Sequence, residues 1–181
     1  MSTNITAKQF AQPDLASQIG EILQQTGTDP RWVDLEITEN IAMADAERSA
    51  VMLSELKALG VRLSIDDFGT GYSSLCRLQQ FPVDMLKIDR TFISGMGRDP
   101  ETQEIVRIIV MLAHSLGLKV VAEGIENEEQ LAMLKEIGCE LGQGYLFSRP
   151  ADPESIEQLL ANYQASGHRP FRSKAAGLPS A

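Results

Sequence analysis

The sequence predicts an α/β fold built around a parallel sheet. Short runs rich in β-branched residues and leucine alternate along the chain with stretches of helical periodicity, and almost every run ends in polar residues. The strand candidates are residues 32–38, 61–67, 83–89, 118–124 and 139–147. Residues 2–6 predict the end of one further strand. We therefore expect six parallel strands connected by helices.

Apolar periodicity and end signals predict five helices. The first begins at Pro13, places four apolar residues on one face and ends at Gly27. These four residues are Leu15, Ile19, Ile22 and Leu23. The last helix begins with Asp152 as its cap and Pro153 in its first turn, a position that proline favours.

The three helices between these two are each followed by a glycine. They are expected at about residues 45–59, about residues 101–116, and from Asn127 to just before Gly138. Asn127 and Gln130 have the spacing of a capping box, in which each side chain bonds the backbone N–H of the other residue.

Length, composition and charge restrict the classes of protein. The chain has 181 residues, 43% of them hydrophobic, which predicts one domain with one ordinary core. Its net charge of −9 repels phosphate backbones, so we expect no nucleic-acid partner, and any phosphate ligand would need metal cations. No apolar run is long enough to span a membrane and no secretory signal is present. The predicted location is the cytoplasm.

Cysteine and histidine give little sign of chemistry. Cys76 and Cys139 are expected to form no disulfide and no metal site. His114 and His168 are expected to pack or face solvent without a partner, which argues against zinc and against a Cys–His nucleophile pair. Residues 166–181 lack apolar periodicity and predict a disordered tail after a domain at 1–165.

The informative residues are the polar ones at the strand ends. They are Asn4, Glu36, Glu39, Asp66, Asp67, Lys87, Asp89, Glu123, Glu126 and Gln143. All carboxyl ends of a parallel βα array emerge on one face, so these groups converge as in (β/α)8 barrels and open doubly wound sheets. One such acid is usually a helix cap or a solvated residue, but five successive strand ends are harder to explain in that way.

This set of residues predicts metal-dependent phosphoryl chemistry. Carboxylate and amide oxygens suit Mg²⁺ or Mn²⁺, and the adjacent Asp66 and Asp67 are placed to hold two cations. Paired divalent ions stabilise attacking and leaving oxygens and generate a hydroxide nucleophile. Lys87 could offset phosphate charge or orient the water, and Glu123 could accept the proton of that water.

The segment DDFGTGYSSL at 66–75 predicts a loop that approaches a ligand closely. Gly69 and Gly71 flank Thr70 and permit backbone conformations that other residues avoid. Ser73 or Ser74 could cap the short helix that follows. A tight strand-to-helix turn explains the same glycines equally well.

Five segments together resemble one known family. LEITEN (35–40), SIDDFGTGYSSL (64–75), LKIDRTFI (86–93), VVAEGIE (120–126) and GQGYLFSRP (142–150) are similar to the motifs of the EAL-domain family. Members of this family are bacterial phosphodiesterases that open cyclic di-GMP to linear pGpG. The resemblance extends from about residue 2 to residue 163 and implies a modified TIM-like (β/α)8 barrel that often dimerises.

The resemblance also implies roles for individual residues. It assigns metal binding to Asn4, Glu36, Asp66, Asp67 and Glu123, with Lys87 and Glu123 as catalytic groups. Gln143 resembles the glutamine on the substrate side, and Glu39 resembles the glutamate that steadies the loop containing Gly69, Thr70 and Gly71.

One departure from the family is as informative as the match. The Glu-Ala-Leu motif, whose glutamate binds metal, is absent, and six strands are visible where a barrel has eight. We expect an incomplete barrel that lacks its first two strands and one metal ligand. Alone it should be weakly active or inactive, and either dimeric or completed by another chain.

Two alternatives remain open on the sequence. The chain could be an inactive EAL module that binds cyclic di-GMP or a protein partner. It could also be an unrelated barrel enzyme in which Lys87 abstracts a proton next to a carboxylate.

Overall fold

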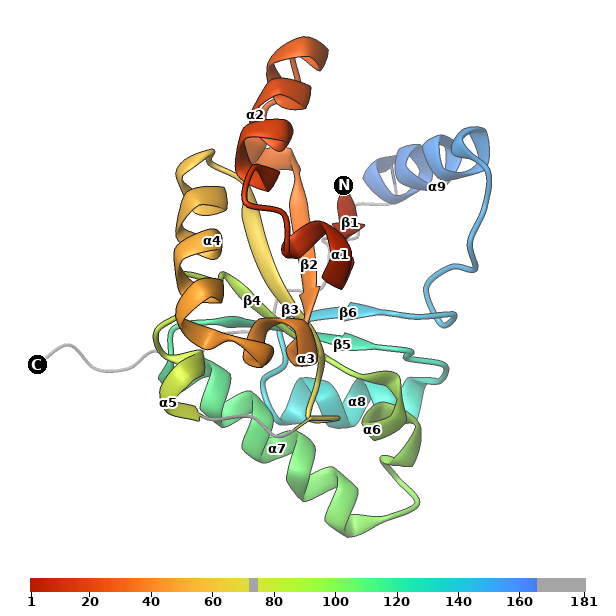
Figure 1. Cartoon of the computed structure of the whole chain (residues 1–181). Helices are drawn as coiled ribbons and strands as arrows, with labels where there is room; N and C mark the ends of the chain where they lie inside the picture. The colour runs from red at the N-terminus through yellow and green to blue at the C-terminus, as the bar shows by residue number, and fades with distance from the viewer. Residues whose placement is uncertain (72–74, 166–181) are drawn as a thin grey trace, which may run out of the picture.

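A six-stranded parallel sheet forms the centre of the molecule, and its strands lie in the order β1-β2-β3-β4-β5-β6 (Figure 1). The structure is a computed structural model that describes residues 1–71 and 75–165. The strands are β1 Ser2–Asn4, β2 Asp34–Thr38, β3 Arg62–Phe68, β4 Met85–Ile88, β5 Lys119–Glu123 and β6 Leu141–Gln143. The predicted parallel α/β fold is confirmed, as an open half-barrel of the TIM-like kind.

The five predicted helices are all present close to their expected positions. They are α2 Leu15–Thr26, α4 Ala46–Ala58, α7 Pro100–Ser115, α8 Glu128–Glu136 and α9 Pro153–Ala165. The short helix expected after the glycine loop is α5 Leu75–Leu78. The structure adds α1 Ala7–Phe10, α3 Glu39–Ala44, α6 Arg90–Gly95 and the 3₁₀ turn η1 Pro30–Trp32. These additional helices are too short to show a periodic apolar face in the sequence.

The predicted end signals also act as expected. The Asn127 side chain accepts the Gln130 N–H at 2.9 Å, and Gln130 Oε1 accepts the Asn127 N–H at 3.3 Å, which completes the capping box. Asp152 Oδ1 accepts the Ser155 N–H at 2.9 Å at the start of α9. Gly27 adopts a left-handed φ of 64° after α2.

The two faces of the sheet differ in polarity, and this difference positions the site. Residues that point toward the helices are apolar and buried, and they pack with buried residues of α4, α7 and α8 in one core. In the strands they are Leu35, Ile37, Leu63, Ile65, Leu86, Ile88, Val120 and Ala122. Because alternate residues of a strand face opposite sides, the polar residues between them gather on the concave face of the half-barrel.

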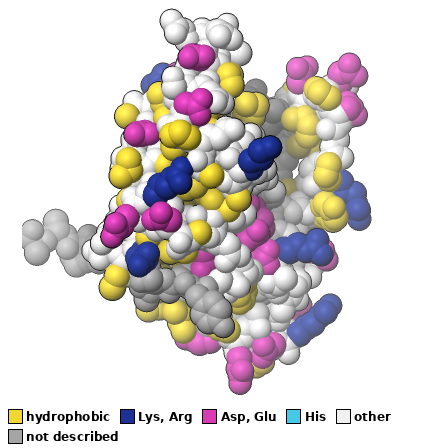
Figure 2. All heavy atoms as spheres, in the orientation of Figure 1, with side chains coloured by type: hydrophobic (Ala, Val, Ile, Leu, Met, Phe, Trp, Pro, Cys, Tyr) yellow, Lys and Arg dark blue, Asp and Glu magenta, His cyan; other side chains and the backbone are white. Residues whose placement is uncertain are grey.

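The first helix packs along a narrower face than its pattern predicts. Leu15 is buried, and Ile19 and Leu23 are partly buried against the core. Ile22, expected on the same face, is 57% exposed because α2 contacts the core along one side only. Val51 on α4 is 60% exposed as well. Figure 2 shows hydrophobic side chains interspersed with acidic and basic ones over α4.

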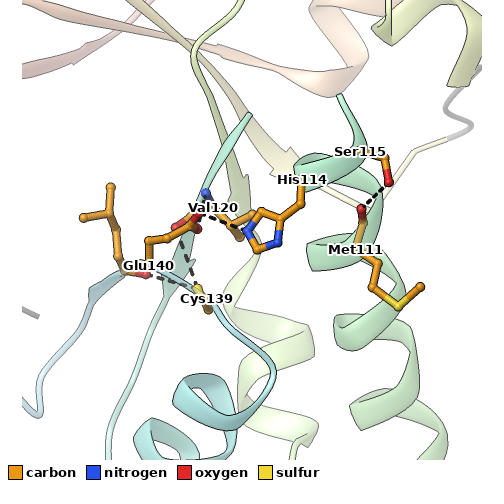
Figure 3. Close-up of polar contacts among 7 residues, drawn as sticks. Met111, His114, Ser115, Val120, Cys139 and Glu140 are labelled. Atoms are coloured by element: carbon orange, nitrogen blue, oxygen red, sulfur yellow. Dashed lines mark hydrogen bonds and ion pairs between the residues drawn. The ribbon is translucent and has the colours of Figure 1, made fainter. Parts of the chain in front are cut away.

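The expectation that His114 has no partner is wrong. Its Nε2 lies 2.9 Å from Glu140 Oε1, and the other oxygen of Glu140 accepts the Val120 N–H at 3.1 Å (Figure 3). Glu140 therefore links α7 to the start of β5. The two residues are far apart in the sequence, and helical periodicity does not reveal such a pair.

The last strand is shorter than the predicted 139–147. Only Leu141–Gln143 pair with β5, because the Phe147 N–H turns back to the Gly144 oxygen at 3.1 Å. A long connection then leads to α9, which stands apart from α7 and α8 in Figure 1.

Some predictions lie outside the described residues. They include the capping serines Ser73 and Ser74, His168 and the disordered tail at 166–181. Across residues 1–71 and 75–165, no helix is long and apolar enough to cross a bilayer.

Candidate active site

A bulge in β3 lets two neighbouring aspartates reach the same site. Ile65 pairs with Leu86 but Phe68 pairs with Ile88, so β3 contains one residue more than β4 between these pairs. Asp67 occupies the bulge with φ 53°, in the left-handed region that aspartate adopts only uncommonly. In a regular strand Asp66 and Asp67 would point to opposite faces, and bulges redirect side chains in this way beside active sites.

Lys87 lies at the centre of the carboxylates that the strand ends bring together. Its Nζ is 2.6 Å from Glu123 Oε1, 2.7 Å from Glu36 Oε2 and 3.2 Å from Asp66 Oδ1. These four residues come from β2, β3, β4 and β5. The predicted convergence of strand-end residues on one face therefore holds for all four.

Burial and charge shift the pKa values of this cluster. Burial alone would lower the pKa of Lys87, but hydrogen bonds to Glu123 and Glu36 and the attraction of the carboxylates raise it. Burial raises the pKa of Glu123, although its bond to Lys87 opposes the shift. The pKa of Asp67 is raised by burial and then by repulsion from Asp66 and Asp89.

The donor set fits a hard divalent cation. Asp66 Oδ1 is buried and, although 3.2 Å from Lys87 Nζ, it accepts no hydrogen bond from the described residues. A buried anionic oxygen without a hydrogen bond calls for a partner, and a bound cation would supply one. Among the described residues, no group of three or more acidic, cysteine or histidine side chains already has a metal-site arrangement. Lys87 stands between three of the carboxylates instead.

Strand register places the two amide residues at the ends of this row. Asn4 pairs with Glu36 across β1 and β2, and Gln143 pairs with Glu123 across β5 and β6. Paired residues of parallel strands point to the same face, so both amides flank the carboxylates on the concave side. Their functional roles remain predictions.

Glu39 lies under the glycine loop that follows β3. Its buried Oε2 accepts the Gly69 N–H at 2.8 Å. A Cβ on Gly71 would lie 2.9 Å from Glu39 Oε1, so a larger residue there would force the Glu39 side chain to shift. The Thr70 hydroxyl donates to the Asp67 oxygen at 2.8 Å and closes the loop on itself.

The structure adds residues to the site that the sequence reasoning did not select. Asp34 is 5% exposed, and its Oδ1 accepts a hydrogen bond from Ser64 Oγ at 2.7 Å. Burial raises the pKa of Asp34, and the negative charge of Glu36 raises it further. The signal for Asp34 was available, because it precedes Glu36 by two residues and so shares its face of β2.

Asp89 combines two roles. It caps α6 by accepting the Thr91 N–H at 2.9 Å and also interacts with the carboxyl group of Asp67. A cavity of about 240 Å³ lies beside Glu123. Arg90, Glu126, Gln143 and Tyr145 contribute to its wall.

Fold and site together define an open half-barrel of the (β/α)8 kind with a cluster of carboxylates at the carboxyl ends of its strands. The EAL domain family matches residues 1–150, and the chain belongs to this family. Membership excludes the alternative of an unrelated barrel enzyme.

Individual relatives agree with the family assignment. The chain is 42% identical to the cyclic di-GMP phosphodiesterase NbdA of Pseudomonas aeruginosa, over 96% of this chain and 22% of NbdA. It is similar to the solved PaMucR phosphodiesterase in complex with c-di-GMP, with 44% identity and a TM-score of 0.83, over 86% of this chain and 63% of that one.

A third structure contains metal. It is the manganese and cyclic di-GMP complex of Klebsiella pneumoniae BlrP1, with 34% identity and a TM-score of 0.75, over 83% of this chain and 38% of that one. The chain spans about a fifth of the length of the curated relatives it matches.

Proposed function

We propose that this chain forms the larger part of a metal-dependent phosphodiesterase domain that hydrolyses cyclic di-GMP to linear pGpG. The observation that supports this proposal is the convergence of Glu36, Asp66 and Glu123, from three strands, within 3.2 Å of one position. The names of the relatives NbdA and PaMucR support the substrate.

The residues that would hold Mg²⁺ or Mn²⁺ are those with amide or carboxylate oxygens on the concave face. They are Asn4, Glu36, Asp66, Asp67 and Glu123. When bound, such ions lower the pKa of bound water and stabilise negative charge on phosphoryl oxygens. Structures of BlrP1 with cyclic di-GMP were solved with manganese and with calcium.

The remaining steps belong to the side chains of this chain. Glu123 accepts the proton of the attacking water, and its raised pKa suits a base more than an ordinary carboxylate does. The positive charge of Lys87 stabilises the charge that grows on the phosphate. Gln143 borders the cavity beside Glu123 and contacts the substrate there.

Closure of the barrel completes the proposal. The sheet ends at β1 on one side and β6 on the other, and Leu141 of β6 is 38% exposed. We infer that two further parallel strands, one carrying the Glu-Ala-Leu motif, close this gap from another segment or chain. Without them the domain lacks one metal ligand and hydrolyses slowly or not at all.

The alternative is an inactive EAL module that binds cyclic di-GMP or a protein partner. The absence of a Glu-Ala-Leu tripeptide from the sequence favours it. A homodimer is a further part of the proposal, because Ile105, Ile108 and Met111 form an apolar row on α7 and are 43%, 55% and 61% exposed.

One experiment separates these functions. The chain, fused to two strand–helix units that carry the Glu-Ala-Leu motif from a longer relative, is incubated with cyclic di-GMP and Mn²⁺. The product pGpG is measured by chromatography, with Glu123→Gln in the same fusion as the control. Product that disappears in Glu123→Gln supports the phosphodiesterase. Binding without product overturns it in favour of the inactive module, and absence of both binding and product overturns both functions.

A further inference from the structure

The Lys87 ammonium group is surrounded by carboxylate oxygens. Three carboxylate oxygens lie within 3.2 Å of Nζ. Those of Glu123 and Glu36 accept hydrogen bonds from the ammonium group, whereas Asp66 Oδ1 interacts with it through charge alone. Each of these oxygens belongs to a different strand, and Lys87 itself is only 5% exposed. Nζ therefore lies between three negatively charged groups.

The charges of this cluster do not balance. Three carboxylates surround one ammonium group, and Asp34 and Asp67 add further negative charge on the same face. Like charges at these separations repel strongly in a partly buried site. The single ammonium charge offsets only part of this repulsion, so the cluster attracts additional positive charge.

We propose that Lys87 and a divalent cation compete for the same carboxylate oxygens, and that binding of the metal expels the Lys87 ammonium from the centre of the cluster. This inference rests on the metal dependence in the proposed function. Mg²⁺ requires oxygens at about 2.0–2.1 Å in near-ideal octahedral geometry. Glu36 and Glu123 are now held at 2.7 and 2.6 Å from Nζ, so an ammonium group and a metal cannot both bind them at that centre.

Two consequences follow from competition. Lys87 holds β2, β3, β4 and β5 together through ion pairs when no metal is supplied, so its removal should lower thermal stability. A divalent cation takes over the same contacts, so added metal should restore the lost stability. A lysine that only oriented a water molecule beside the metal would produce neither exchange.

The test measures metal affinity and melting temperature in the full chain. The variants are Lys87→Met, which keeps most of the length of the side chain without its charge, and Lys87→Gln, which is shorter and neutral but keeps N–H donors. Lys57→Met is the matched control, because Lys57 pairs with Asp84 near the opposite end of the strands. Mn²⁺ binding is followed by calorimetry, and melting by circular dichroism in EDTA and in excess Mn²⁺.

We expect both Lys87 variants to bind Mn²⁺ at least tenfold more tightly than the unsubstituted chain. They should melt at a lower temperature in EDTA and recover most of that loss in Mn²⁺. Lys57→Met should lose stability equally in both conditions and keep the original Mn²⁺ affinity.

Equal or weaker Mn²⁺ affinity in the Lys87 variants overturns the competition but leaves the proposed function intact. Tighter Mn²⁺ binding in the Lys87 variants, with no pGpG formed by the chain fused to the two missing strands, supports the competition while the proposed function fails. If no chain binds Mn²⁺, both proposals are overturned.

Discussion

The carboxylate of Asp34 illustrates how the position of a residue in a strand decides which face of the sheet its side chain occupies. Asp34 and Glu36 share the concave face, whereas Leu35 between them is buried in the core. A residue-by-residue search for acids at strand ends finds Glu36 and passes over Asp34, which lies two residues earlier. Its bond to Ser64 and its burial show that the acidic region extends deeper along the strands than the ends alone indicate.

The two cysteines differ in a way that chemistry can measure. Cys139 is 1% exposed, burial raises the pKa of its thiol to about 12, and its Sγ donates to the Leu141 oxygen at 3.3 Å. Only the thiolate is nucleophilic. We expect iodoacetamide at pH 8 to leave Cys139 unmodified in the folded chain and to alkylate the exposed Cys76.

Mass spectrometry of the digested protein checks this prediction. Cys76→Ser should show no native labelling, Cys139→Ser should retain one labelled site, and urea should make both cysteines reactive. Comparable native alkylation rates at the two sites would contradict the burial of Cys139.

At the scale of elements, the loop after β5 is held in place by hydrogen bonds to β6 and the loop that follows it. The Ile125 N–H donates to the Gln143 oxygen at 3.1 Å, and the Ile125 oxygen accepts the Leu146 N–H at 3.0 Å. Gly144 lies against this backbone so closely that a Cβ would sit 2.1 Å from the Ile125 oxygen. The two loops therefore hold Glu123, two residues before Ile125, as one unit.

Gly144→Ala tests this contact between the loops. The added methyl group would force the Ile125 backbone to move, and we expect a loss of about 1–3 kcal/mol in the free energy of unfolding. Glu123 should shift with it and Mn²⁺ binding should weaken. Urea denaturation followed by circular dichroism gives the stability.

Gly20→Ala is the control for this substitution. Gly20 lies inside α2, and a Cβ there would meet only Leu59 Cδ2 at 3.4 Å. Alanine stabilises the interior of a helix by up to about 1 kcal/mol relative to glycine. Equal stabilities of Gly144→Ala and the unsubstituted chain would show that the loops are free to adjust.

The sequence predicts those elements whose signals are local. Three of these predictions depend on residues that are close in the sequence, and each is confirmed. They are the capping box at Asn127, the cap at Asp152 and the alternation of short strands with helices. The bulge at Asp67 and the pair of His114 with Glu140 depend on residues brought together only by the sheet. The convergence of Glu36, Asp66 and Glu123 was predictable because the carboxyl ends of parallel strands share one edge. The position of Lys87 between them was not, because it depends on how the side chains pack in the folded sheet.

On the scale of the whole molecule, the open sheet is the dominant feature. Unpaired strand edges at β1 and β6 are templates for association with another chain. The isolated chain is therefore expected to self-associate or to unfold at a low temperature.

Closing the sheet tests the molecule as a whole. We expect that fusing the two strand–helix units that carry the Glu-Ala-Leu motif from a longer relative gives a more stable chain. Cyclic di-GMP hydrolysis should rise at least tenfold, because the missing metal ligand is supplied. Light scattering reports association, and pGpG formation reports activity.

The control is the same fusion with the glutamate of its Glu-Ala-Leu motif changed to alanine. It should gain stability but not activity. A fusion that gains neither would argue against the closure of the barrel by such strands.

The strand order has a consequence for how the molecule is made. Each strand pairs with the segment that the ribosome synthesised just before it, from β1 through β6. Pairing between neighbouring segments has a small entropic cost of chain closure, so the sheet can grow in step with translation. The groups around Lys87 are thus assembled in sequence, and the emerging polypeptide acquires its last acidic contact only when Glu123 has left the exit tunnel.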